Sequence, residues 1–302
     1  MTDQINDASF QRLEPRSAAE KGIDNTFKIV ATICACGIAL VLMWIILQIL
    51  IAAWPAIRQF GVFSFLFGKE WNPVQNVFGI APAILGTLVS SVIALAIAVP
   101  IGLGVAVFLS EDFINPKIQN IFVFLVQLLA AIPSVVYGLW GIFVLIPFLR
   151  PIGVTGASLL PASLVLAVMV LPTIASISRD AITNVPTDMR QAAVGLGATR
   201  WESILQIILP AASSGIIGAI MLGLGRALGE TMAVTMLIGN SNRISFSPFA
   251  PSNTISALLA NQFAEASGLQ VSALMYAALV LAIITLGVNV LAQLVVTQLQ
   301  KI

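Results

Sequence analysis

The chain has 302 residues, of which 59% are hydrophobic and 9% charged, and its mean hydropathy is +1.01. Soluble domains carry roughly 25% charged residues, so this composition excludes an ordinary soluble protein and indicates a polytopic helical membrane protein. The formal net charge of +1 gives no support for nucleic-acid binding. The sequence contains no histidine, which excludes catalysis, metal ligation and pH switching by that residue.

Residues 1–26 mix acidic and basic side chains and lack the short apolar core of a signal peptide. They are interpreted as a mostly disordered cytosolic tail, and residues 27–302 as one transmembrane domain. The two cysteines, Cys34 and Cys36, lie in an apolar run without other metal ligands nearby. They are interpreted as packing residues, and no metal site is expected.

Six apolar runs are each long enough to cross a bilayer as a helix, which takes about 20 residues. They cover residues 27–54, 79–109, 117–149, 159–177, 211–238 and 271–296. The predicted fold class is therefore all-α, with six transmembrane helices. Pro133 and Pro147 lie inside the third run, where we expect them to kink the helix. A short helix is expected near residues 254–266, within the last long loop.

Counts of Lys and Arg favour an orientation with both termini in the cytosol, because basic residues concentrate on that side of a membrane. In this orientation nine basic residues are cytosolic: Arg12, Arg16, Lys21, Lys28, Lys117, Arg179, Arg190, Arg200 and Lys301. Four are external: Arg58, Lys69, Arg150 and Arg243. The segment 179–209 is then cytosolic, and the loops 56–78 and 239–270 face the outside.

Residues 187–209, the coupling segment, show a helical pattern that is interrupted at Gly197. A glycine at this point permits a turn between two short helices. One interpretation is an amphipathic helix lying on the bilayer, but that predicts more basic residues than the two arginines present. Small Ala192 and Ala193, expected on the exposed side, allow close approach of a partner and favour a protein-docking helix.

The spacing of this segment resembles the cytosolic loop of ATP-binding-cassette (ABC) importer permeases. The matching residues are Gln191, Ala192, Ala193, Gly197, Leu209 and Pro210. The resemblance implies the type I ABC importer permease fold, in which this loop is the coupling helix held in a cleft of the cytosolic ATPase. The first position of the motif is usually Glu, so Gln191 offers a neutral hydrogen bond in place of a charge-assisted one.

Further motifs resemble the phosphate-specific importers, and in particular their C-type permease subunit. They are Trp71-Asn72-Pro73, Gly86-Thr87-Leu88, Ala131–Gly138 and Gly225–Thr235. The resemblance implies a permease forming half of the translocation pathway in the bacterial plasma membrane. It also implies an A-type permease partner, two cytosolic ATPase subunits and an external phosphate-binding protein.

Arg226 and Glu230 place two opposite charges inside the fifth apolar run, and at this spacing they are expected to share a helix face. A charge at mid-bilayer costs about 3 kcal/mol even on the gentlest scale, so such residues usually face a cavity. We interpret Arg226 as a donor to a passing phosphate, with Glu230 keeping the local charge near zero. A structural pair that only orients helices is the alternative. Ser134, Thr231 and Thr235 are candidates for neutral hydrogen bonds along the pathway.

The sequence lacks the Gly-rich ATP-binding loop, since its only Gly-Lys pair, Gly68-Lys69, is followed by Glu70. The chain is therefore expected not to be an enzyme and to hold no cofactor. ATP and Mg²⁺ are expected on the partner ATPase.

Three alternatives stay open at this point. The substrate could be another oxyanion, such as molybdate or sulfate. The chain could be an ion-coupled secondary transporter, although such a protein does not need the coupling segment. A sensory role in phosphate signalling could be added to transport.

Overall fold

The computed structural model describes residues 18–111, 113–245 and 247–299. Most of the predicted tail, residues 1–17, and the basic Lys301 lie outside the described residues. The chain forms two units, one up to Gln48 and one from Ile49 onward. Among the described residues the first unit holds only the first part of one helix, so nearly all of the fold belongs to the second unit.

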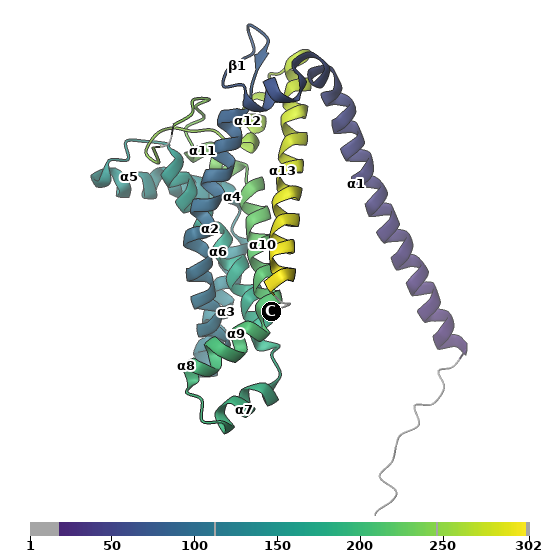
Figure 1. The fold of residues 1–302 in the computed structure, drawn as a ribbon, viewed down its shortest axis with the longest axis vertical. Coiled ribbons are helices and arrows are strands. Elements are labelled where there is room, and N and C mark those ends of the chain that lie inside the picture. Colours follow the sequence, from purple (N-terminus) through teal and green to yellow (C-terminus); the bar gives the residue numbers. More distant parts are fainter. Residues whose placement is uncertain (1–17, 112, 246, 300–302) are drawn as a thin grey trace, which may run out of the picture. The chain divides into compact units, whose positions relative to one another are not determined.

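Helix α1 (Ala18–Phe67) carries the first predicted span (Figure 1). It begins within the region assigned to the tail, because Ala18, Ala19, Glu20 and Lys21 are all good helix formers that extend the apolar run upstream. Its apolar side chains are exposed, including Phe27 and Trp44. The helix is kinked at Gly61, where φ is +67°, a backbone conformation that glycine adopts without steric cost.

A two-stranded antiparallel hairpin follows, with β1 (Trp71–Asn72) paired to β2 (Val77–Phe78). The sequence analysis treated this region only as a loop. The side-chain oxygen of Asn72 accepts hydrogen bonds from the backbone N–H groups of Val74 and Gln75, which closes the turn. Below the hairpin, Phe65 stacks on Tyr276 with ring centroids 4.1 Å apart, so this end of the unit has a core of its own.

The third predicted span is two helices, not one kinked helix. Helix α3 (Pro116–Ala131) ends before Ile132, whose backbone is extended, and α4 (Ser134–Trp140) begins after Pro133. Proline lacks an N–H and disfavours helical geometry in the residue before it, which explains the break. The Leu129 carbonyl, four residues before Pro133, accepts from the Tyr137 hydroxyl at 2.8 Å and, over 3.4 Å, from the Ile132 N–H. These donors replace the N–H that Pro133 lacks. The chain continues through η1 (Gly141–Leu145), α5 (Ile146–Leu149) and η2 (Arg150–Ile152).

The fifth predicted span is also divided. Helix α10 (Ser213–Gly229) is bent by 70° from the helical stretch Arg200–Ala211 that precedes it. At its other end it stops at Gly229, and α11 (Met232–Leu237) starts two residues later. The short external-loop helix predicted near residues 254–266 is confirmed as α12 (Ile255–Gln262), which Thr254 caps by accepting a hydrogen bond from the Ala257 N–H at 3.1 Å.

The centre of the second unit is α6 (Leu159–Thr183), which packs against α2 (Ala81–Ser110) and α10. In its most apolar stretch 61% of the residues are buried, against 28% in α2 and in α13 (Leu269–Leu299). Helix α6 also packs against α3, α4 and α11, and these neighbours on several sides explain its burial. Helices α6, α10 and α13 leave a groove between them, which is described below.

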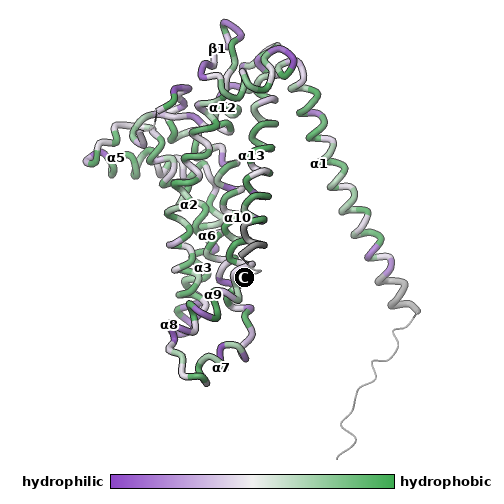
Figure 2. Tube along the Cα trace, viewed as in Figure 1, coloured by the Kyte–Doolittle hydropathy of each residue, from purple (hydrophilic) through white to green (hydrophobic). Residues whose placement is uncertain are grey.

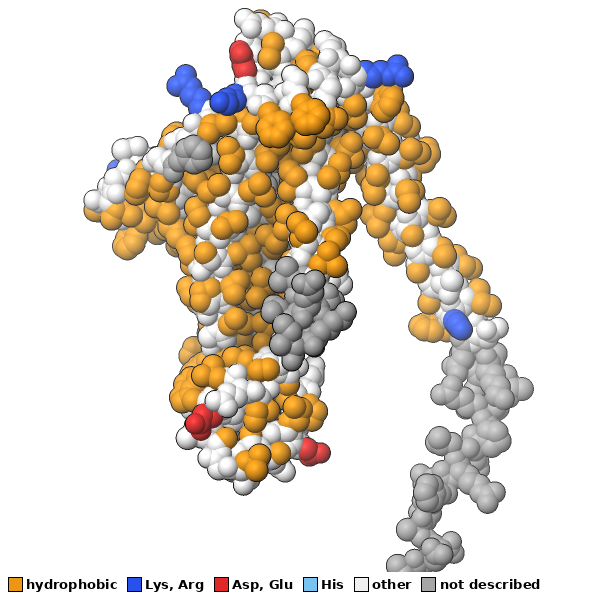
Figure 3. All heavy atoms as spheres, in the orientation of Figure 1, with side chains coloured by type: hydrophobic (Ala, Val, Ile, Leu, Met, Phe, Trp, Pro, Cys, Tyr) orange, Lys and Arg blue, Asp and Glu red, His pale blue; other side chains and the backbone are white. Residues whose placement is uncertain are grey.

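Five helical stretches of the described residues are long and apolar enough to cross a membrane, or six when α10 and its bent neighbour are counted together. Hydrophobic residues follow α2, α6, α10 and α13 along their lengths (Figure 2). On the face seen in Figure 3, charged side chains gather at the end with α7 and α8 and at the end with β1, with hydrophobic side chains between them. The predicted all-α, multi-pass membrane fold is confirmed.

Candidate functional site

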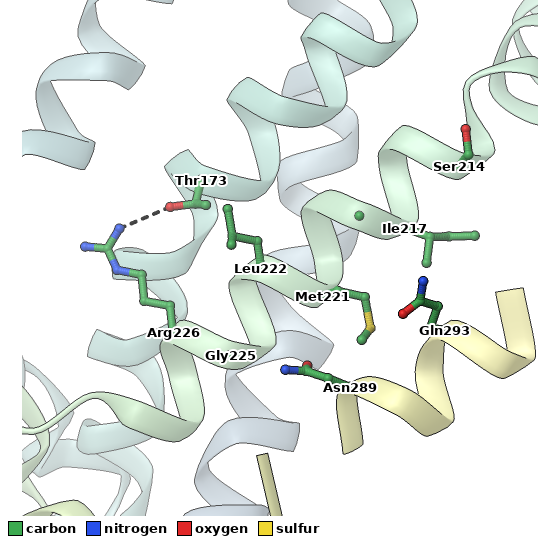
Figure 4. Close-up of a pocket in the computed structure, with 10 residues that line it drawn as sticks. Thr173, Ser214, Ile217, Met221, Leu222, Gly225, Arg226, Asn289 and Gln293 are labelled. Atoms are coloured by element: carbon green, nitrogen blue, oxygen red, sulfur yellow. Dashed lines mark hydrogen bonds between the residues drawn. The ribbon is translucent and has the colours of Figure 1, made fainter. Parts of the chain in front are cut away.

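A groove of about 900 Å³ opens between α6, α10 and α13 in the second unit (Figure 4). The residues that line it are Thr173, Ser214, Ile217, Gly218, Met221, Leu222, Gly225, Arg226, Asn289 and Gln293. Arg226 is the only charged residue among them. This chain therefore gives the groove a positive charge, set in otherwise neutral walls.

Arg226 extends from α10 toward α6, where its Nη1 donates to the Thr173 hydroxyl oxygen at 3.1 Å. A guanidinium group has five N–H donors in a planar fork. Thr173 takes one of them, and no other side-chain hydrogen bond of Arg226 occurs among the described residues. The remaining donors are available for oxygen atoms of an anion in the groove.

Glu230 does not pair with Arg226, and the predicted shared helix face is wrong. Helix α10 ends at Gly229, and Glu230 has extended backbone geometry, with φ −65° and ψ +127°. The four-residue spacing brings side chains together only on a continuous helix. The Glu230 carboxylate instead accepts a hydrogen bond of 3.4 Å from the Ala233 N–H at the start of α11, where a negative charge is favoured by the helix dipole.

The three neutral pathway candidates do not line this groove either. Thr231 precedes α11, and Thr235 within α11 donates its hydroxyl to the Thr231 carbonyl at 2.6 Å. Ser134 is the first residue of α4, which packs against α11. These residues belong to the region where two interrupted helices meet, while Arg226 alone of the predicted pathway set faces the groove.

The sequence analysis missed four polar residues of the groove: Thr173, Ser214, Asn289 and Gln293. A signal for two of them was present. Asn289 and Gln293 are four residues apart in the apolar run of α13, a spacing that places both on one helix face. Polar side chains at such a spacing in a membrane span indicate a face turned toward a cavity or another helix.

The coupling segment folds as predicted around a turn at Gly197. Helix α7 (Thr187–Gly195) ends just before it, and α8 (Arg200–Ser203) follows. Gly197 has φ +86°, so the turn requires the left-handed geometry that glycine provides. After α8 the chain continues through η3 (Ile204–Ile208) and α9 (Leu209–Ala211), which contains Leu209 and Pro210, to the bend before α10.

The start of α8 is fixed by a capping box between Thr199 and Glu202. The Thr199 hydroxyl oxygen accepts from the Glu202 N–H at 3.3 Å, and the Glu202 carboxylate accepts from the Thr199 N–H at 2.7 Å. Hydrogen bonds from the Thr199 hydroxyl and N–H stabilise the carboxylate and lower the pKa of Glu202. The capping box thus fixes the N-terminus of α8, the second helix of the coupling segment, after the turn at Gly197.

One residue of the docking face is placed differently from the prediction. Ala193 is buried, because α7 turns it toward η3, whereas Gln191 and Ala192 are exposed. The turn carries Leu196, which is 89% exposed. An apolar side chain this exposed, beside a small exposed alanine, is suited to burial by a partner surface.

Helix α7 is attached to the rest of the unit through Arg190, a contact that the sequence analysis did not predict. Its guanidinium group pairs with the Glu111 carboxylate just after α2 and donates to the Ile182 carbonyl on α6 at 2.7 Å. Nearby, Arg179 Nε donates to the Leu109 carbonyl at 3.0 Å. Arg179 on α6 and Arg190 on α7 therefore both hold the end of α2.

No cluster of three or more metal-ligating side chains occurs in the part of the chain that the structure describes. The lining of the groove offers hydrogen bonding and charge, provided by Arg226 and its neutral neighbours.

A sequence model of the family described as "Binding-protein-dependent transport system inner membrane component" matches residues 98–301. The chain therefore belongs to this family of membrane transport permeases. Its relatives include the phosphate transport system permease protein PstC of Haemophilus influenzae, which is 43% identical over 300 residues, 92% of this chain and 95% of that protein. The PstC protein of Mesorhizobium japonicum is 46% identical over 237 residues, 72% of each chain. The resemblance to C-type phosphate permeases is confirmed.

Solved structures agree on the fold. A chain of a bacterial alginate ABC transporter, in complex with an alginate-bound periplasmic protein, aligns over 93% of this chain and 98% of its own length, with a TM-score of 0.66 and 18% identity. A chain of the MetNI methionine ABC transporter in an inward-facing form aligns over 76% of this chain and 96% of its own, with a TM-score of 0.57 and 20% identity. The predicted type I ABC importer permease fold is confirmed.

Proposed function

We propose that this chain is the transmembrane permease subunit of an ATP-driven phosphate importer and forms half of the translocation pathway. The observation that carries the proposal is the groove between α6, α10 and α13, in which Arg226 is the one charged side chain among the described residues that line it. A planar guanidinium with free donors suits the oxygen atoms of phosphate. The names of the relatives support phosphate as the substrate.

The energy for transport would come from partner subunits. Two cytosolic ATPase subunits would bind the ATP and Mg²⁺, and one of them is expected to hold the coupling segment of this chain at Gln191, Ala192 and the turn at Gly197. The exposed Leu196 supports this assignment, since it offers an apolar surface for a partner to cover. An A-type permease would complete the pathway, and an external phosphate-binding protein would deliver the anion.

The chain would lie in the bacterial plasma membrane with both termini in the cytosol. This orientation follows from the distribution of Lys and Arg. It places α7 and α8 in the cytosol and the β1–β2 hairpin outside.

The test is uptake of labelled phosphate by the complete complex in proteoliposomes, with ATP on the ATPase side and competing sulfate or molybdate. Phosphate uptake that requires ATP, and that a tenfold excess of sulfate leaves unchanged, supports the proposal. Inhibition by sulfate or molybdate at equal concentration would favour another oxyanion. Uptake that follows an ion gradient without ATP would favour a secondary transporter.

An Arg226→Gln variant tests the groove itself. Its uptake is expected to fall at least tenfold while the complex still assembles, because the neutral amide cannot replace the charge. The matched control is Arg150→Gln, which removes an exposed arginine outside the groove. Equal uptake by the Arg226→Gln variant and the wild type would refute the role of the groove.

A further inference from the structure

Asn289 and Gln293 form a neutral polar face on α13, in a helix that is otherwise apolar around them. Both side chains point from α13 toward α10 and line the groove that contains Arg226. Between Tyr276 and Gln293 the only other residue with a polar side chain is Thr285, which does not line the groove. The polar groups of this part of α13 are thus concentrated on the groove.

The side chain of Asn289 has no hydrogen-bond partner in the part of the chain that the structure describes. Its side-chain oxygen is buried and unpaired, and its amide makes no side-chain hydrogen bond among the described residues. A buried polar atom without a partner costs about 1–3 kcal/mol. The α10 residues opposite it in Figure 4, Met221, Leu222 and Gly225, have no polar side-chain group to offer. Asn289 therefore does not serve to join α13 to α10.

The polar residues of the groove are arranged along its length. Arg226 and Ser214 are twelve residues apart on α10, which corresponds to about 18 Å along a helix axis. Asn289 and Gln293 are four residues apart on α13, about 6 Å. The groove thus runs from one cationic residue past a series of neutral hydrogen-bonding groups to the end of α10 nearer the coupling segment.

A pathway with a single strong site would retain its anion, because passage requires binding that is weak or shared among several positions. An amide is suited to a second position. Its N–H₂ group donates to charged phosphate oxygens, and its carbonyl oxygen accepts from a P–OH group. It attracts the anion without adding a positive charge.

We propose that Asn289 and Gln293 are substrate-contacting residues that receive phosphate as it leaves Arg226 and hold it weakly on its way to the cytosol. This inference rests on the proposed function, and it gives a substrate-binding role to the part of the same groove that lies beyond Arg226. The unpaired oxygen of Asn289 is the group that the P–OH of hydrogen phosphate satisfies.

The first experiment compares the double variant Asn289→Leu with Gln293→Leu against the wild type in the complete reconstituted complex. The maximal rate of labelled phosphate uptake is expected to fall at least tenfold, while ATP hydrolysis stays within twofold. The conservative Asn289→Gln variant should retain most of the uptake. Thr285→Val, which removes a hydroxyl from the same helix outside the groove, should leave the rate unchanged.

A purely structural role of the two amides would reduce complex recovery, ATP hydrolysis and uptake together. That result, or uptake within twofold of the wild type in the double variant, overturns the proposal. If the wild type is active and Arg226→Gln is inactive while the double variant transports normally, only this inference fails. If the wild type itself does not transport phosphate, the proposed function fails.

The second experiment does not depend on transport. Asn289→Cys, in a background with Cys34→Ala and Cys36→Ala, is treated with a small anionic thiol reagent in the purified complex. Phosphate is expected to slow the modification at least threefold, and chloride at the same ionic strength should not. An unchanged rate in phosphate overturns the contact between Asn289 and the anion.

Discussion

Arg190 on α7 and Glu111 after α2 form an ion pair between residues 79 positions apart in the chain. The Glu111 side chain is 10% exposed and the Arg190 side chain 23%. Arg190 also donates to the Ile182 carbonyl, so a single guanidinium joins α7 to α2 and α6. A displacement of α7 by a partner would therefore reach α6, the central helix of the unit, directly through this side chain as well as along the backbone between them.

Replacing Glu111 by Gln is expected to weaken this attachment. The loss should be about 1–3 kcal/mol, below the value for a fully buried pair because Arg190 is partly exposed. The measurements are the amount of ATPase subunit that co-purifies with the permease, the rate of ATP hydrolysis and the rate of phosphate uptake. The number of phosphate ions taken up per ATP hydrolysed is expected to fall.

The matched control is Asp188→Asn, which removes an exposed acid from α7, the helix that carries Arg190. The reversed pair, Glu111→Arg with Arg190→Glu, should recover part of the coupling. If Glu111→Gln and Asp188→Asn behave alike, the ion pair has no role in transmission.

The turn at Gly197 gives a second prediction. Its φ of +86° lies in a region that costs a residue with a Cβ about 1–2 kcal/mol, although no atom lies where that Cβ would be. Gly197→Leu should therefore act through the backbone and reduce ATPase recovery and uptake. Gly197→Asn should be milder, since asparagine tolerates this conformation.

Gly195 provides the control. It also has open space at its Cβ position, but its φ is not in the left-handed region. Gly195→Leu is expected to preserve coupling. A Gly197→Leu complex as active as Gly195→Leu would show that the turn geometry does not matter.

The sequence predicted the runs of apolar residues well, because hydropathy depends on the local composition of each helix. It did not predict where those helices stop. Pro133 ends α3 in place of bending it, and α10 ends at Gly229, so that Glu230 lies outside the helix and accepts a hydrogen bond from the Ala233 N–H. Helix breaks of this kind depend on a few backbone residues that barely alter the mean hydropathy.

Contacts between residues that are far apart in the chain could not be predicted from the sequence either. Nothing in the local pattern around Glu111 indicates Arg190, and nothing around Arg226 indicates that Thr173 will accept its hydrogen bond. The turn at Gly197 was predictable because it depends on one residue type and its neighbours. The groove was not, because three helices far apart in the sequence form its walls.

The orientation in the membrane is tested by cysteine labelling. In a background without Cys34 and Cys36, cysteines at Ser64 and Ser252 should react with an impermeant reagent added outside. A cysteine at Thr187, which is exposed on α7, should react only after the membrane is permeabilised. Ser203 is unsuitable as an internal reporter because it is buried. The opposite labelling pattern would reverse the assigned orientation.

Arg226 and Glu230 provide the last prediction, because their separation in the structure changes what a double substitution should do. If they formed a buried pair, removing one charge would leave the other uncompensated at about 3–5 kcal/mol, and removing both would restore the complex. Since Arg226 instead donates to Thr173 and Glu230 accepts from the Ala233 N–H, no such restoration is expected. Arg226→Gln should assemble and lose uptake. Glu230→Gln should cost only about 0.3–1 kcal/mol, because an amide oxygen can still accept from the Ala233 N–H and only the negative charge near the start of α11 is lost. The double variant should show the sum of the two effects, as expected for side chains that do not interact. The measurement is complex recovery and phosphate uptake for the wild type, the two single variants and the double variant. A double variant that transports better than Arg226→Gln alone would show that the two charges do meet during the transport cycle.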